Sequence, residues 1–158
     1  MRGIEVAASG RVALSVDRQS LWPLLFQPEI LQRVIPGAKS VTQLSENSFE
    51  ADLSLGVGRR FSSRYTVHLD LMDIQPDHSF KAAGEARGSL GGGTAEGWIR
   101  LEETPTGCNL DWQYKGVVTG TVTRAGRLAV RFASRLFLSR LFIQLGKEVT
   151  RDAIGTAR

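Results

Sequence analysis

Apolar and polar residues alternate along most of the chain before residue 120. The alternation is cleanest between Ser48 and Val57, where one face carries Phe49, Ala51, Leu53, Leu55 and Val57. A period of two predicts a strand with one face toward a core. The same pattern predicts strands over residues 4–16, 38–44, 48–57, 61–74, 80–87, 95–101 and 110–119.

Two short helices and several turns interrupt this series. Asp17 is placed to cap a helix that runs to Leu25, and Pro28 suits the first turn of a second helix that ends near Val34. Ile35-Pro36-Gly37 stops the second helix, because proline disfavours helix before it and glycine supplies a turn. Turns between later strands are predicted over residues 75–78, 88–93 and 104–107.

The pattern changes to helical spacing after residue 120. Residues 121–154 lack proline, and their arginines and apolar residues recur every three or four positions. Strands joined by short turns and followed by one long helix predict an α+β fold, in which an antiparallel sheet of about seven strands wraps around the C-terminal helix. A curved sheet that grips a helix leaves a cavity where inward side chains do not fill it. We expect one domain over residues 1–158.

Composition and charge narrow the class of protein. The 158 residues are 42% hydrophobic and 23% charged, values typical of a globular domain. Residues 124–158 hold eight Lys or Arg and two acids, so this segment carries +6, whereas the whole chain carries +4 and the remainder therefore −2. No apolar run is long enough for a transmembrane helix, and the start lacks the apolar region of a signal peptide. With one cysteine, the expected location is the cytoplasm, including the inner face of the plasma membrane.

A helical wheel counted from Arg124 divides the long helix into two halves. In the first half the side opposite the arginines carries Ala125, Ala129, Phe132, Ala133 and Leu136. Beyond Leu138 the basic and apolar sides exchange, with Arg140, Lys147 and Arg151 where the apolar side was. One straight helix on one sheet cannot bury both apolar faces.

Three explanations for the second apolar face remain open. The helix kinks, ends near Ser139 or packs locally; a second protomer or another partner covers the face; or the face rests in a lipid interface with basic residues near the headgroups. The last two explanations predict membrane or partner contact through Arg140, Leu141, Phe142, Leu145 and Lys147.

Several short motifs occur in a characteristic order. They are Leu21-Trp22, Pro28-Glu29-Ile30-Leu31, Ile35-Pro36-Gly37, Thr94-Ala95-Glu96-Gly97, Gly120, Gly126-Arg127-Leu128 and Leu141-Phe142. In this order the chain resembles the CoxG family of carbon monoxide dehydrogenase subunits, within the helix-grip superfamily that is also called START-like or SRPBCC. The resemblance implies a small accessory protein that assists a molybdenum-containing dehydrogenase at the membrane by carrying a quinone. Relatives often have a longer membrane-attached tail; here we expect any membrane contact from the helix itself.

The candidate ligand site is a set of inward residues. The predicted cavity lining is Tyr65, Val67, Leu69, Trp98, Trp112, Tyr114, Phe132 and Leu136. The aromatic members suit a flat apolar ligand such as a quinone or lipid, and they suit a packed core equally well. No covalently bound cofactor is expected.

Candidate catalytic and metal-binding groups are sparse. His68 and His78 lack a second ligand at metal spacing, Cys108 lacks a neighbouring base, and the glycines at 91–93 lack the Lys-Ser/Thr of a phosphate loop. We therefore expect no catalytic or metal site, and no nucleic-acid partner. Two alternatives stay open: a cyclase- or hydrolase-type enzyme using Ser63, Tyr65 and Tyr114, or a module that docks on a partner or a second copy without a ligand.

Overall fold

The computed structural model describes residues 3–56 and 62–156, with side chains described up to Thr150. A single antiparallel sheet has the strand order β1-β7-β6-β5-β4-β3-β2. Its strands are β1 Ile4–Leu14, β2 Ala38–Ser45, β3 Ser48–Leu55, β4 Ser63–Gln75, β5 Ser79–Gly88, β6 Gly91–Thr104 and β7 Gly107–Thr119. The predicted α+β helix-grip architecture is confirmed.

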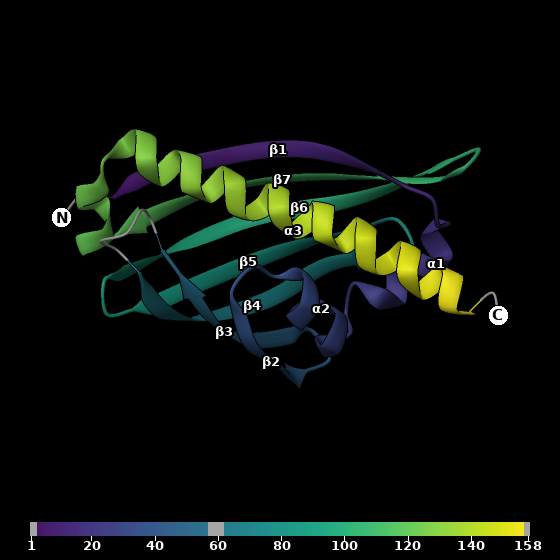
Figure 1. The fold of residues 1–158 in the computed structure, drawn as a ribbon, viewed down its shortest axis with the longest axis horizontal. Coiled ribbons are helices and arrows are strands. Elements are labelled where there is room, and N and C mark those ends of the chain that lie inside the picture. Colours follow the sequence, from purple (N-terminus) through teal and green to yellow (C-terminus); the bar gives the residue numbers. More distant parts are fainter. Residues whose placement is uncertain (1–2, 57–61, 157–158) are drawn as a thin grey trace.

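Helices lie on one face of this sheet. The long helix α3 (Arg127–Thr156) runs across the sheet, and α1 (Arg18–Leu24) and α2 (Pro28–Val34) lie near its C-terminal part (Figure 1). The side chain of Asp17 caps α1 by accepting from the backbone N–H of Ser20 at 3.2 Å, as the sequence predicted. We call the face of the sheet toward α3 the inner face.

The starts of two elements differ clearly from the predicted ones. The glycines at 91–93 begin β6 instead of forming a turn, and they pair with β5 and β7. The predicted strand ends at Val57 and Phe61 lie outside the described residues. The segment before α3 is a separate 3-10 helix, η1 (Thr121–Ala125), because Gly126 adopts a φ of 97° that ends one helix before the next begins.

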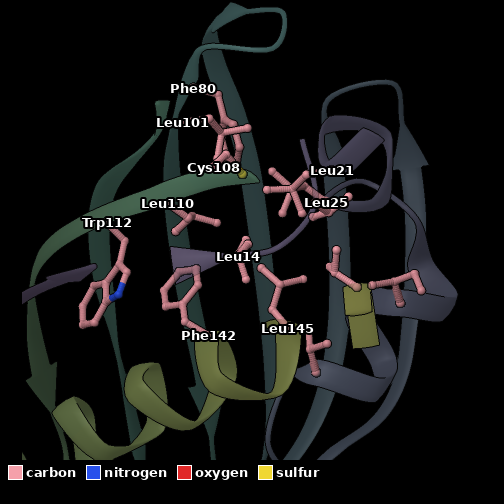
Figure 2. Close-up of a cluster of buried hydrophobic side chains, with 14 of the residues drawn as sticks. Leu14, Leu21, Leu25, Phe80, Leu101, Cys108, Leu110, Trp112, Phe142 and Leu145 are labelled. Carbon is pink, nitrogen blue, oxygen red and sulfur yellow. The ribbon is translucent and has the colours of Figure 1, made fainter. Parts of the chain in front are cut away.

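The main core lies under the C-terminal half of α3. Phe142 and Leu145 rise from α3 toward Leu110 and Leu14 on the sheet (Figure 2). The helices α1 and α2 add Leu21, Leu25, Ile30 and Val34 to the same cluster. Near the start of α3, a smaller cluster packs Val130 against Ile4 and Val6 on β1.

This core decides among the three explanations for the second apolar face of the helix, and it corrects the predicted membrane or partner contact through Phe142 and Leu145. Phe142, Leu145 and Val149 are 6%, 3% and 1% exposed, so Phe142 and Leu145 are not available to a membrane or a partner. The helix does not end at Ser139 but continues to Thr156. Local packing accounts for the face, because α2 supplies a second apolar surface beside the sheet.

Candidate functional site

A pocket of about 500 Å³ lies between the inner face of the sheet and α3. Strands β3 to β7 supply one wall, and the first four turns of α3 supply the other. Most of the residues that line it are aliphatic, aromatic or glycine. The pocket adjoins the main core at Phe80, Leu138 and Phe142, which contribute to both.

The pocket exists because its floor is made of the smallest residues. Three successive inward pairs between β5 and β6 consist of alanine and glycine only: Ala82 with Gly97, Gly84 with Ala95, and Ala86 with Gly93. These six residues all line the pocket. A side chain that stops at Cβ or Cα cannot bridge the distance from the sheet to the helix, so the space stays open.

One floor position can accept a larger side chain. A Cβ built at Gly84 would meet only Leu69 Cδ1 at 3.4 Å and the His68 carbonyl oxygen at 3.6 Å, which are ordinary contacts. A Cβ at Gly93 or Gly97 would instead collide with the carbonyl oxygen of Val117 or Gln113. Gly84 is therefore the position at which the pocket can be filled without moving the backbone.

An aromatic stack closes the pocket on the core side. The rings of Trp112 and Phe142 are stacked, with centroids 5.1 Å apart, and the rings of Trp112 and Tyr114 are stacked with centroids 6.3 Å apart. Gly10 on β1 allows this arrangement, because a Cβ there would lie 2.6 Å from the indole ring. The stack presents flat apolar surface to the pocket.

Hydroxyl groups supply the polar character of the lining. Burial raises the pKa of Tyr65. Burial also raises the pKa of Tyr114, and this effect is larger than the lowering that neighbouring groups cause. The hydroxyl of Ser134 on α3 and the positive charge of Arg135 lie near the Tyr114 phenol and act to lower its pKa. At neutral pH both phenols are therefore protonated and can donate a hydrogen bond to an acceptor atom on a ligand.

Five of the eight predicted cavity residues place side chains on this pocket. They are Tyr65, Val67, Leu69, Trp112 and Tyr114. Trp98 also borders the pocket, but its register opposite Lys81 and Gln113 turns the ring to the outer face, where the Arg100 guanidinium lies 4.5 Å from the ring centroid.

The two residues predicted from the helix were wrong. Phe132 is 68% exposed and faces away from the pocket, and Leu136 is half-buried without lining it. The pocket instead receives Val130, Ala133, Ser134, Phe137, Leu138 and Phe142. Their spacing of three to four residues was visible in the sequence, but the wheel placed the buried side opposite the arginines.

The arginines do not mark the side of α3 opposite the sheet. Arg131 Nε donates to the Glu5 carbonyl oxygen on β1 at 3.1 Å, so this side of the helix flanks the edge of the sheet. The buried side near the start of α3 is consequently displaced by about a quarter turn from the predicted one.

The five residues of α3 that were predicted to contact a membrane or a partner differ in their exposure to solvent. Arg140 and Lys147 are exposed, Leu141 is half-buried, and Phe142 and Leu145 belong to the core. Glu148 is buried as well, with a carboxylate oxygen 3.7 Å from Arg33 Nη1 on α2. This ion pair joins α2 to the same part of α3 that the core joins.

The other candidate groups lie outside the pocket. His68 Nε2 is 3.0 Å from Asp70 Oδ1 on the outer face, and His78 Nδ1 is 3.2 Å from Arg18 Nη1. Cys108 is fully buried, and this burial raises the pKa of its thiol. Within residues 3–56 and 62–150, no three His, Cys, Asp or Glu side chains are grouped so that they could hold a metal ion.

Across residues 3–56 and 62–156, no helix is both long enough and apolar enough to span a bilayer.

Comparisons with known structures agree with this architecture. A conserved protein from Geobacillus kaustophilus is 26% identical, with a TM-score of 0.80 over 96% of each chain. A START superfamily protein from Mycobacterium smegmatis is 12% identical, with a TM-score of 0.65 over 94% of this chain and 99% of that one.

A third similar structure is the di-domain aromatase/cyclase StfQ of the steffimycin biosynthetic pathway. It is 13% identical, with a TM-score of 0.70 over 95% of this chain and 52% of that one. At this identity the likeness concerns the fold alone. The comparison with curated proteins finds no match.

Comparison with protein families gives the assignment. The family model for the carbon monoxide dehydrogenase subunit CoxG matches residues 10–150, which include α1, α2, every strand from β2 to β7, the last five residues of β1 and the pocket-lining part of α3. The match covers most of the chain and agrees with the START-like architecture. The chain belongs to the CoxG family of carbon monoxide dehydrogenase subunits.

Proposed function

We propose that this protein is a non-catalytic carrier that holds an apolar small molecule in the pocket under α3. The observation that carries the proposal is the pocket itself: about 500 Å³, lined mainly by apolar side chains and floored by three alanine–glycine pairs. Its volume falls within the range of about 300–1,000 Å³ that is typical of small-molecule sites. An apolar space of this size lowers stability through lost packing contacts, which a bound apolar ligand would restore.

The lining favours a flat ligand with a hydrogen-bond acceptor, and a quinone has both properties. Its ring could lie between the flat floor of Gly84 and Ala95 and the helix. The phenol of Tyr114, close to Ser134, could donate to a ring carbonyl oxygen. A lipid with an apolar chain and a carbonyl group is the second ligand class that fits the same chemistry.

A binding role is favoured over a catalytic one by the groups near the pocket. Glu85 and Glu96 border it, but they alternate with the inward residues Gly84 and Ala95 and form ion pairs with Arg87 and Lys115. Among the residues that the structure describes, the remaining ionisable groups on its inner wall are the phenols of Tyr65 and Tyr114, and the raised pKa of each makes it a poor base at neutral pH.

The partner follows from the family. We propose that the carrier serves a molybdenum-containing dehydrogenase and exchanges its ligand with the membrane as a peripheral protein on the cytoplasmic side. The family match is the support for a dehydrogenase partner.

Two measurements test the carrier function. Native mass spectrometry of the purified protein should show a mass above that of the chain, and extraction should release an apolar molecule. Titration with a short-chain quinone should quench the tryptophan fluorescence saturably, because Trp112 stands at the pocket wall. A folded protein that neither retains an apolar molecule nor binds the quinone or a lipid would overturn the proposal. A ligand that is chemically altered on the protein would favour an enzyme.

A matched pair of variants assigns the binding to the pocket. Gly84→Leu places four carbons into it, and we expect at least about a tenfold loss of quinone affinity. Ala83→Leu adds similar bulk one residue away on the opposite face of β5 and should leave the affinity unchanged. Equal affinities for both variants would show that the quinone binds elsewhere.

A further inference from the structure

The first turns of α3 expose large apolar side chains that the fold does not need. Leu128 is 85% exposed and Phe132 is 68% exposed. They line one groove with Val117 of β7, which is also exposed, so the helix and the sheet both contribute apolar side chains to this groove. Contiguous exposed apolar surface on a folded protein commonly marks an interaction site.

Unpaired cations surround this apolar surface. Arg131 and Arg135 line the same groove, and Arg127 precedes Leu128 on the helix. All three are exposed, and none has a carboxylate within 4 Å among the side chains that the structure describes. We call Val117, Leu128, Phe132, Arg127, Arg131 and Arg135 the basic–apolar patch.

We propose that the basic–apolar patch docks this protein on an anionic lipid bilayer. This inference rests on the proposed function, because a carrier of an apolar ligand must meet a membrane to load or unload. Leu128 and Phe132 would enter the boundary between headgroups and acyl chains, while the arginines stay at the level of the phosphates. The site differs from the distal part of α3, whose Phe142 and Leu145 are buried.

Charge and geometry together favour a lipid surface as the occupant. The apolar residues and the arginines share the same turns of one helix, which is the arrangement of helices that lie in a membrane interface. The acids of the groove are Glu5, Asp70, Glu85 and Glu96, and they all stand on the strands. Of these, Asp70 lies beside His68, and Glu85 and Glu96 are paired with Arg87 and Lys115, so two of the four carboxylates are compensated by a neighbouring cation.

The same turns of α3 connect the patch to the pocket. Val130, Ala133 and Ser134 face the ligand space, whereas Leu128 and Phe132, on the same two turns, face the groove. A membrane that holds the outer side of these turns would therefore lie within one helix diameter of the pocket wall, about 10 Å.

Vesicle co-sedimentation tests the patch. The wild type should bind vesicles of equimolar phosphatidylcholine and phosphatidylglycerol, and bind phosphatidylcholine alone much more weakly. The double variant Leu128→Ser/Phe132→Ser should bind the anionic vesicles at least about tenfold more weakly, because it loses two apolar anchors. Arg127→Gln/Arg131→Gln should cause a loss of about tenfold or more, as expected for two cations near an anionic surface.

Matched controls come from β2 and β4, at residues that do not line the groove. Leu44→Ser replaces an exposed leucine on β2, and Lys39→Gln/Arg64→Gln removes two exposed cations that are also unpaired among the described side chains. Both control variants should bind anionic vesicles like the wild type. All the replaced residues are exposed, but Arg131 also donates to the Glu5 carbonyl oxygen. The thermal unfolding midpoint of each variant should therefore be measured, and a loss of binding with an unchanged midpoint can be assigned to the surface.

The outcomes separate this proposal from the carrier function. The patch variants should keep the quinone affinity, and Gly84→Leu should keep vesicle binding. Quinone binding without vesicle binding would overturn the docking surface and leave the carrier function standing. Vesicle binding that the patch variants do not weaken would also overturn it. A wild type that ignores vesicles but dimerises through Phe132, as light scattering would show, would assign the patch to a second copy.

Discussion

The inner face of one sheet is built in two different ways along α3. Toward the C-terminal part of α3, large inward pairs such as Leu101 with Leu110 pack in the main core, and Phe80 with Ile99 forms its border with the pocket. Toward the N-terminal part, the same strands carry alanine–glycine pairs and leave the pocket. We call these regions the filled end and the open end. The difference shows that side-chain size along β5 and β6, rather than the fold, decides where a ligand space exists.

Removing core volume should separate the two ends most clearly. Leu110→Ala at the filled end empties a fully buried site and should lower the free energy of unfolding by about 3 kcal/mol. Phe137→Ala at the open end enlarges an existing pocket and should cost about 1 kcal/mol, because the lost contacts face space that is already open. Urea unfolding of both variants measures the two values. Equal costs would contradict the contrast between the ends.

Adding side-chain volume should again destabilise the filled end more than the open end. Cys108→Leu adds a net two non-hydrogen atoms to a site that is fully buried among Phe80, Leu101 and Leu110, and should destabilise the protein by about 2 kcal/mol. Ala86→Leu extends into the pocket and should change stability by less than about 1 kcal/mol in either direction. Thermal unfolding of ligand-free samples provides the comparison. A strongly destabilised Ala86→Leu would mean that the open end is packed more tightly than the structure indicates.

The filled end could be predicted from the sequence better than the open end, for a physical reason. Alternation fixes which strand residues face inward, and it correctly placed Tyr65, Val67 and Leu69 on the pocket. It does not make an alanine–glycine pair look like a binding site, because small residues also occur in turns and close strand contacts. The glycines at 91–93 were therefore predicted as a hairpin turn instead of the start of β6.

The helix α3 shows a different limit of prediction from the sequence. The wheel detected that α3 carries two apolar faces, but it assumed that the arginines point away from the protein. Which face of a helix is buried depends on all its neighbours, and α2 was not recognised as one of them. The prediction therefore exchanged the roles: Phe132 is exposed, whereas Phe142 lies in the core.

The boundary between the two ends can be tested at Gly10. An alanine there would place its Cβ 2.6 Å from the Trp112 ring, so the indole must shift and its stack with Phe142 must loosen. We expect Gly10→Ala to cost about 1–1.5 kcal/mol and to change the tryptophan emission spectrum. Gly126→Ala is not a fair control because of its positive φ, but Ala83→Ser, on the outer face, is. An unchanged spectrum for Gly10→Ala would mean that the stack does not depend on this glycine.

The titration of one side chain at each end should give the smallest differences in stability between the two ends. At the open end the folded pKa of Tyr114 is raised above its usual value of 10.0, so its stabilisation is present below pH 10 and is lost as the pH rises through the folded pKa. Tyr114→Phe should flatten this alkaline loss by less than about 1 kcal/mol, since the phenol is partly solvent-screened.

At the filled end the N-cap Asp17 has a pKa lowered from 3.8, chiefly by the Ser20 hydroxyl. Its stabilisation is present above pH 3.8 and is lost as the pH falls through the lowered folded pKa. Asp17→Asn keeps a capping acceptor without a charge, and should therefore lose less stability than the wild type on acidification. Urea midpoints across acidic and alkaline pH measure both variants. If Tyr114→Phe altered the acid limb, or Asp17→Asn the alkaline limb, the assignment of each titration to one end of α3 would be wrong.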